Sequence, residues 1–163
     1  MNLTGPALVF GDEINTDELH PSRFYSLDDV RVRSGFLRAV EGKEDQGQRP
    51  FEGAIVVAGR TFGIGSSRET GARVFRLAGI RALVAVSFAR IFHRNLLNLG
   101  LLAVTAPGLA TVKPADGELV TVDLAANLVR FGPHALPIEP LDPHWRAVLD
   151  AGGLAAYLGI EER

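Results

Sequence analysis

Cysteine is absent from all 163 positions of the sequence. Disulfide bonds are therefore excluded, and so is an iron–sulfur cluster held by thiolates of this chain. The four histidines also lack the tight spacing of metal-ligand pairs, since they stand at His20, His93, His134 and His144. If the chemistry of this protein requires a metal, we expect another chain to supply it.

Long apolar runs and an excess of charge of one sign are missing as well. No apolar stretch approaches the ~20 residues that a membrane span requires. With 17 basic and 19 acidic side chains, the formal net charge is −2, which argues against a nucleic-acid partner. The N-terminus lacks a basic segment followed by an apolar core, so we expect no secretory signal and a cytoplasmic protein. The length predicts a single domain over residues 1–163.

One stretch, residues 59–69, carries the clearest local signal, GRTFGIGSSRE. It follows the apolar run 54–58, which predicts a buried strand, and it precedes residues 72–78, which predict a helix. Glycines let a ligand approach main-chain N–H groups closely, and the start of a helix favours an anion. Arg68 adds a rigid guanidinium for a carboxylate or phosphate. The stretch therefore predicts a site for an anionic small molecule.

Two serines, Ser66 and Ser67, follow the last glycine of this stretch. Ser66 and Glu69 fit a capping box, in which each side chain satisfies one free N–H of the first helical turn. On this pattern alone, Ser66 is a helix cap. A stand-alone nucleotide-binding module is an alternative for the stretch, but the sequence has neither a G-K-[ST] motif nor a G-x-G-x-x-G motif at the strand end.

The chain as a whole predicts a mixed α/β fold. The expected strands lie at residues 7–10, 54–58, 80–86 and 101–104, with helices at 72–78 and 88–99. This alternation predicts a parallel sheet with right-handed crossovers. Residues 118–131 predict a hairpin, and Pro143 is expected to open a terminal helix. Ser87 is expected to cap the helix at 88–99, and the apolar-free residues 41–50 predict a mobile loop or lid.

Four separated segments resemble the aconitase swivel-domain family, which includes the small subunits of 3-isopropylmalate dehydratase and homoaconitase. Residues 11–21 resemble its G-D-x-I-x-T-D-x-x-x-P segment, and residues 62–69 resemble its F-G-x-G-S-S-R-E signature. Residues 87–95 and 151–154 are similar to later segments of the family. The resemblance covers nearly the whole chain and implies a three-layer β/β/α swivelling domain with a mixed sheet.

The resemblance also implies an activity. Family members are small subunits of a heteromeric hydro-lyase, in a heterodimer or heterotetramer whose large subunit holds a four-iron four-sulfur cluster. The small subunit binds no cofactor or metal and closes over a di- or tricarboxylate substrate. By this resemblance, Ser66 is the base that removes the Cα proton and Asp17 lies at the catalytic site, while Ser67 and Arg68 bind the substrate carboxylate. A helix cap remains the alternative for Ser66, and a swivel domain that has lost its chemistry is the alternative for the chain.

By the same resemblance, the loop after Pro21 contacts the γ-group of the substrate. This makes Phe24, Tyr25 and Ser26 candidates for substrate binding. Homoaconitase-type loops use an arginine for an additional carboxylate, and Ser26 occupies that position here. The apolar character of the loop suits an isopropyl group better, which favours 2-isopropylmalate and leucine biosynthesis. Because Arg23 is close by, a homoaconitase small subunit in lysine biosynthesis remains the alternative.

One departure from the family pattern follows the signature. Relatives usually carry histidine or tyrosine and then a small residue, whereas Thr70 and Gly71 stand here. A glycine inside a helix costs about 1 kcal/mol relative to alanine, so Gly71 requires a structural explanation.

Overall fold

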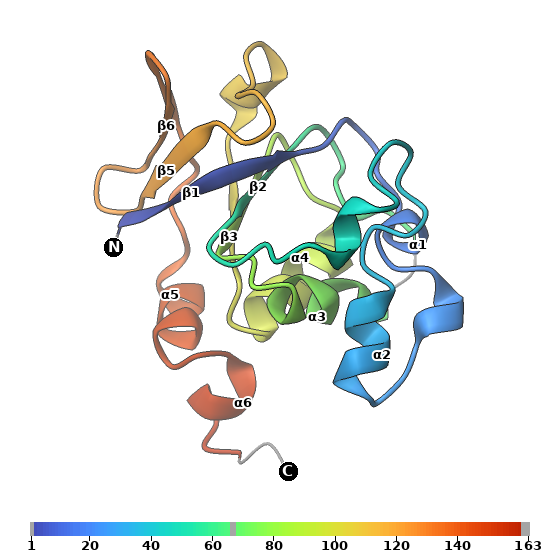
Figure 1. Cartoon of the computed structure of the whole chain (residues 1–163). Coiled ribbons are helices and arrows are strands. Elements are labelled where there is room, and N and C mark those ends of the chain that lie inside the picture. The colour runs from blue at the N-terminus through green and yellow to red at the C-terminus, as the bar shows by residue number, and fades with distance from the viewer. Residues whose placement is uncertain (1, 66–67, 161–163) are drawn as a thin grey trace.

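A computed structural model of the chain describes residues 2–65 and 68–160 (Figure 1). Within these residues the strands form one sheet in the order β4-β3-β2-β1-β5-β6-β7. The strands are β1 (Asn2–Val9), β2 (Ile55–Ala58), β3 (Ala82–Ala85), β4 (Leu102–Thr105), β5 (Leu119–Asp123), β6 (Leu128–Phe131) and β7 (His134–Pro137). The helices are α1 (Thr16–Leu19), α2 (Asp29–Ser34), α3 (Thr70–Leu77), α4 (Arg90–Asn98), α5 (Pro143–Asp150) and α6 (Leu154–Tyr157). Short 3-10 turns lie at Ser22–Phe24, Gln46–Gln48 and Pro107–Ala110.

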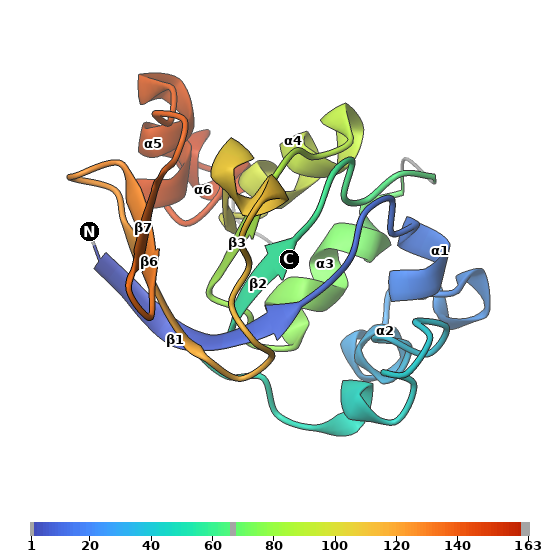
Figure 2. The same cartoon turned by 90° about the horizontal axis from the view of Figure 1, so that it is seen from above.

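The long strand β1 joins two halves of the sheet. Its residues 7–9 pair in parallel with β2, whereas its residues 2–6 pair antiparallel with β5. β2, β3 and β4 continue the parallel half, and β5, β6 and β7 form the antiparallel half. Figure 2 shows β1 curving from one half to the other. The sheet is therefore mixed and curled around this strand.

Alternate residues of the parallel strands face two different cores. In β2, Val56 and Ala58 belong to the core that packs against α3 and α4, while Ile55 and Val57 belong to the core shared with the antiparallel strands. Strands buried on both faces are apolar throughout, as the run in β2 is. Two cores separate three layers, so the expected β/β/α arrangement is confirmed.

The predicted order of elements is largely confirmed. Residues 54–104 fold as β2, α3, β3, α4 and β4, as their alternation predicts. The hairpin is formed by β5 and β6, and Pro143 opens α5. The edge strand β7 and the short helix α1 were not predicted.

Ser87 does not cap α4, contrary to prediction. The helix begins at Arg90 with Ala89 as its N-cap, so Ser87 lies too far upstream. Its Oγ instead accepts a hydrogen bond from the N–H of Thr61 at 2.9 Å. The Ser87 carbonyl also accepts the N–H of Phe62 at 3.0 Å. Ser87 therefore holds the glycine-rich loop against the end of β3.

The predicted capping box at the start of α3 is also wrong. The helix begins at Thr70, and Glu69 is its N-cap without a side-chain capping hydrogen bond. A capping box places the carboxylate at the third helical position, whereas here the loop continues as far as Glu69. Ser66, the other member of the predicted pair, lies outside the described residues.

Residues 41–50 contain a folded segment, whereas the sequence predicted no folded element there; a role as a lid stays a prediction. They form turns and the 3-10 segment Gln46–Gln48, in which Gly47 is buried. The guanidinium of Arg33 donates to the carbonyl of Gly47, and to that of Arg49 at 2.7 Å. Lys43 pairs with Asp116 at 3.3 Å. The segment is thus anchored by two of its backbone carbonyls and by the side chain of Lys43.

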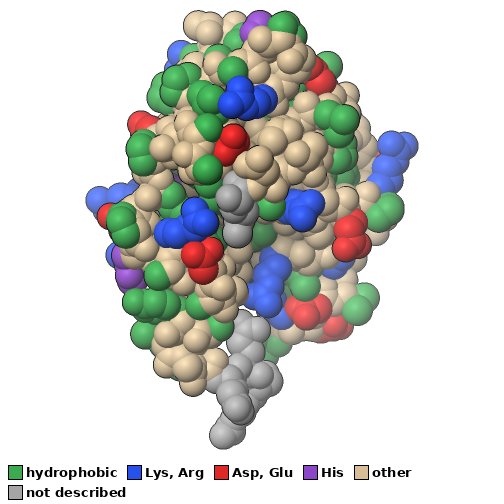
Figure 3. All heavy atoms as spheres, turned by 90° about the vertical axis from the view of Figure 1, so that its left-hand side faces the viewer, with side chains coloured by type: hydrophobic (Ala, Val, Ile, Leu, Met, Phe, Trp, Pro, Cys, Tyr) green, Lys and Arg blue, Asp and Glu red, His purple; other side chains and the backbone are tan. Residues whose placement is uncertain are grey.

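The surface carries charges of both signs. On the face shown in Figure 3, Lys and Arg side chains stand beside Asp and Glu side chains. This matches the near balance of 17 basic and 19 acidic residues. Within the described part of the chain, every helix is too short or too polar to cross a lipid bilayer.

Replacing Gly71 by alanine is expected to raise the free energy of unfolding by about 0.5–1 kcal/mol. Gly71 is buried in the first turn of α3, and a Cβ added there would lie 3.5 Å from Cβ of Thr16, an ordinary van der Waals contact. The methyl group therefore fits, and alanine loses less backbone entropy on folding. Urea denaturation of Gly71→Ala and wild type measures the difference. A less stable variant would mean that α1 and α3 pack too closely here for a methyl group.

Candidate functional site

Two segments far apart in the sequence run side by side beyond the C-terminal ends of β1 and β2. They are the acidic segment 11–17 and the glycine-rich loop 59–65. Backbone hydrogen bonds of 2.7 to 3.0 Å join them, from Glu13 to Arg60, from Gly63 to Ile14 and from Thr16 to Ile64. In α/β sheets, ligands bind outside the C-terminal ends of the strands. The pairing therefore brings both motif-bearing segments to the edge of the sheet where a site is expected.

The glycines of the loop make this pairing possible. Gly65 has a φ of 107°, and a Cβ there would lie 2.3 Å from Oδ1 of Asn15. That oxygen caps α1 by accepting the N–H of Asp17 at 2.8 Å. Gly63, with a φ of 84°, lies directly against the ring of Phe92. The sequence predicted that a ligand approaches the backbone closely at these glycines. At these two positions, side chains of the protein itself make that close approach.

Asp12 ties the same two segments together at their outer end. Its Oδ1 accepts the N–H of Arg60 at 2.7 Å, and its Oδ2 lies 3.5 Å from the guanidinium of Arg60. This backbone hydrogen bond lowers the pKa of the Asp12 carboxyl, and the charges of Lys113 and Arg60 add to the effect. Asp12 is therefore ionised at neutral pH, where it acts as a structural tie.

Three of the predicted site residues meet at the surface beside these segments. The Tyr25 hydroxyl donates to Oδ1 of Asp17 at 3.1 Å, and Cζ of Arg68 lies 4.7 Å from the centroid of the Tyr25 ring. Asp17 and Arg68 are exposed, whereas Tyr25 is half-buried. A carboxylate, a phenol and a guanidinium thus form one open cluster, called here the Asp17–Tyr25–Arg68 cluster. The predicted Ser66 and Ser67 immediately precede Arg68 and lie outside the described residues.

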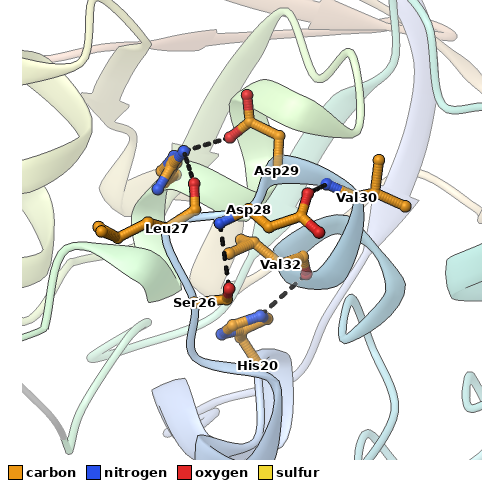
Figure 4. Close-up of polar contacts among 8 residues, drawn as sticks. His20, Ser26, Leu27, Asp28, Asp29, Val30 and Val32 are labelled. Atoms are coloured by element: carbon orange, nitrogen blue, oxygen red, sulfur yellow. Dashed lines mark hydrogen bonds and ion pairs between the residues drawn. The ribbon is translucent and has the colours of Figure 1, made fainter.

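The other two predicted substrate-binding residues have structural partners. The half-buried ring of Phe24 packs near His20, with the guanidinium of Arg23 4.9 Å from its centroid. Ser26 Oγ accepts the N–H of Asp28 at 3.0 Å, just before α2 begins (Figure 4). A role of Phe24 and Ser26 toward substrate stays a prediction.

A buried histidine, His20, packs against Tyr25 of this cluster from the protein interior. The sequence did not identify His20 as part of the site. The side chain is 0% exposed, and its Nε2 lies 2.9 Å from the carbonyl oxygen of Val32 (Figure 4). Its ring stacks on that of Tyr25, with the ring centroids 5.4 Å apart. Burial lowers the pKa of the imidazole, although the hydrogen bond to Val32 partly opposes this effect. We therefore assign a neutral ring with its proton on Nε2. A histidine before Pro21 indicates the end of a helix, and no sequence pattern indicated a buried ring.

The turn between the cluster and α2 presents one apolar side chain to solvent. Leu27 is 94% exposed. Its backbone is fixed nevertheless, because Arg73 of α3 donates to the Leu27 carbonyl at 3.2 Å and pairs with Asp29 (Figure 4). The turn therefore holds Leu27 outward in a defined position.

Fold and site motifs together define the class of protein. Residues 10–108 match the family described as the aconitase C-terminal domain, and the chain belongs to this family. The resemblance inferred from the motifs is thereby confirmed.

Comparison with individual proteins narrows the class. The chain is 40% identical over 160 residues to the 3-isopropylmalate dehydratase small subunit of Pyrobaculum calidifontis, covering 97% of this chain and 98% of that protein. It is 35% identical over 158 residues to the protein of the same name from Saccharolobus islandicus, covering 97% and 94%. The crystal structure of a 3-isopropylmalate dehydratase (leuD) from Methanocaldococcus jannaschii is similar with a TM-score of 0.86 at 33% identity, covering 98% of this chain and 94% of that chain.

Proposed function

We propose that this chain is the small subunit of a 3-isopropylmalate dehydratase, a hydro-lyase that acts in the cytoplasm in leucine biosynthesis. The reaction interconverts 2-isopropylmalate and 3-isopropylmalate by dehydration and rehydration. The observation that carries the proposal is the meeting of Asp17 and Arg68, from two separate motifs, in one open cluster. Nearly full-length similarity to proteins of that name supports it.

The residues of this chain suit the two tasks of the small subunit. The substrate is a dicarboxylate, and the planar guanidinium of Arg68 matches a carboxylate in a bidentate arrangement. The oxyanion of Ser66 would take the Cα proton, and the electron pair of that C–H bond would form the C=C bond. The hydroxyl would leave from the neighbouring carbon as water, with a proton from an acid of the closed site. A serine hydroxyl is a weak base at neutral pH, so its oxyanion needs stabilisation by nearby donors such as Arg68.

The leaving hydroxyl also needs a Lewis acid. We assign this task to a four-iron four-sulfur cluster of the large subunit, because this chain has no cysteine to hold one. A catalytic site must also exclude water, whereas Asp17 and Arg68 are exposed here. A large subunit that covers the cluster, in a heterodimer or heterotetramer, meets both needs.

Substrate preference tests the proposal. The purified complex of both subunits is expected to convert 2-isopropylmalate with a higher kcat/KM than homocitrate or homoaconitate. The aromatic and aliphatic residues around Tyr25 favour an isopropyl group over an additional carboxylate. A preference in the opposite sense would favour the second candidate, a homoaconitase small subunit. One observation favours this second candidate. Arg23 is exposed, and its guanidinium lies beside the ring of Phe24, where it could bind an additional carboxylate.

Replacing Leu27 by serine is expected to weaken binding of the large subunit by about tenfold or more, since a buried leucine contributes ~1.5–3 kcal/mol. We place this side chain at the subunit interface because it stands outward beside the open cluster. The melting temperature should stay within 2 °C of wild type, about the shift of a neutral surface substitution. Calorimetric titration of the two subunits measures the affinity.

The matched control is Leu119→Ser, which removes a leucine that is 66% exposed on β5 in the antiparallel layer. We expect this variant to bind the large subunit with wild-type affinity. Equal affinities for the two variants would place Leu27 outside the interface.

A further inference from the structure

We propose that Tyr25 is a positioning residue that holds Arg68 and Asp17 in their working orientation, and that it makes no direct contribution to substrate binding. The inference rests on the proposed function, because it assigns a role inside that site. It changes the interpretation of Tyr25 based on the family resemblance, which made this residue a substrate contact.

The polar and apolar parts of Tyr25 are both engaged within the protein. Its hydroxyl donates a hydrogen bond to the carboxylate of Asp17, and the guanidinium of Arg68 lies over its ring. A cation over an aromatic face is attracted by the negative potential of the ring. The two charged groups that we assign to the reaction are therefore held by one side chain between them.

The ring of Tyr25 is itself held in place from the interior. It stacks on His20 with an interplanar angle of 23°, and His20 is anchored by the carbonyl of Val32. Gly35 packs directly against this histidine, because a Cβ added to Gly35 would lie 2.8 Å from Cδ2 of His20. His20 is therefore buried and held by a hydrogen bond and a close backbone contact, and Tyr25 packs on this supported ring.

This support matters because arginine is a long and flexible side chain. Fixing it in one rotamer costs conformational entropy. A contact that already exists in the free protein offsets this cost before the substrate binds. A donor that is already aligned stabilises developing charge without reorganisation during the reaction. Because Arg68 is exposed, burial does not restrict its side chain. We infer that its contact with the ring of Tyr25 does so instead.

The test compares Tyr25→Leu and Tyr25→Phe in the complex with the large subunit. Tyr25→Leu removes the aromatic face and is expected to lower kcat by about 10²-fold, the usual effect of a misplaced catalytic group. Tyr25→Phe keeps the ring beneath Arg68 and loses the hydrogen bond to Asp17, so its kcat is expected to lie between those of Tyr25→Leu and wild type. Tyr157→Leu, which removes the other tyrosine of the sequence, is the matched control and should leave kcat unchanged.

A double-mutant cycle separates positioning from substrate contact. If Tyr25 acts through Arg68, Tyr25→Leu should have little further effect in an Arg68→Ala background, so that the two losses are not additive. Full additivity of Tyr25→Leu with Arg68→Ala would overturn the proposal in favour of a substrate contact.

An NMR measurement on the isolated small subunit tests the proposal without measuring enzyme activity. The Nε–H proton of Arg68 should show an upfield ring-current shift in wild type and Tyr25→Phe, and lose it in Tyr25→Leu. An unshifted proton in the folded wild-type protein would also overturn the proposal. Failure of the proposed function would appear separately, as a wild-type complex that does not convert 2-isopropylmalate.

Discussion

Replacing Ser66 by alanine is expected to lower kcat of the reconstituted complex by about 10²–10⁴-fold, the range that a positioned general base contributes. The loss should fall on kcat rather than on KM, because the base acts on the Cα proton only in the transition state. Initial rates with 2-isopropylmalate over a range of concentrations measure both constants.

The neighbouring serine provides the control for this variant. Ser67→Ala is expected to act mainly on KM, since Ser67 is assigned to the substrate carboxylate that is bound throughout the reaction. Unchanged turnover in Ser66→Ala would support the alternative of a swivel domain that has lost its chemistry. A helix-cap role for Ser66 is already disfavoured, because Glu69 is the N-cap of α3.

Replacing Phe62 by alanine is expected to lower the free energy of unfolding by about 3–5 kcal/mol, as other large truncations in protein cores do. Phe62 is 0% exposed and lies within the glycine-rich loop. Its ring contacts several aromatic neighbours at centroid distances of 5.4 to 6.3 Å, namely Phe10, Phe75, Phe88 and Phe92. Truncation would leave a cavity between the sheet, α3 and α4. Denaturant titration by circular dichroism measures the loss.

Phe62→Leu separates cavity size from loss of the aromatic ring. We expect this variant to cost less than half as much as Phe62→Ala, because most of the buried volume is retained. The same variants test the link to the site, since the backbone of Phe62 pairs with Ser87 and Ala89. A cost below about 1 kcal/mol for Phe62→Ala would be incompatible with a tightly packed aromatic core.

The parts of the fold that the sequence predicted share a physical feature. β2 and β3 are buried on both faces between two cores, so their apolar runs are continuous and easily recognised. The site was predicted in outline because its residues stand in two compact motifs. The structure brings one residue of each motif, Asp17 and Arg68, to the same aromatic ring.

The parts that were missed depend on contacts between distant segments. β7 is a mostly exposed edge strand and carries no apolar alternation. The close neighbours of Gly63 and Gly65, Phe92 and Asn15, are far from them in the sequence, so the loop pattern suggested a ligand instead. The stacking of His20 on Tyr25 likewise has no signature at the level of residue spacing.

The position of β1 in the middle of the sheet has a consequence for biosynthesis. Residues 2–6 are synthesised well before their partner strand β5, which ends at Asp123. At about 5–20 residues per second, translation takes roughly 6 to 24 seconds to supply that partner. During this interval one edge of β1 presents unpaired N–H and C=O groups to other chains. Until β5 has been synthesised, β1 is therefore a strand at which pairing with other chains can compete with folding.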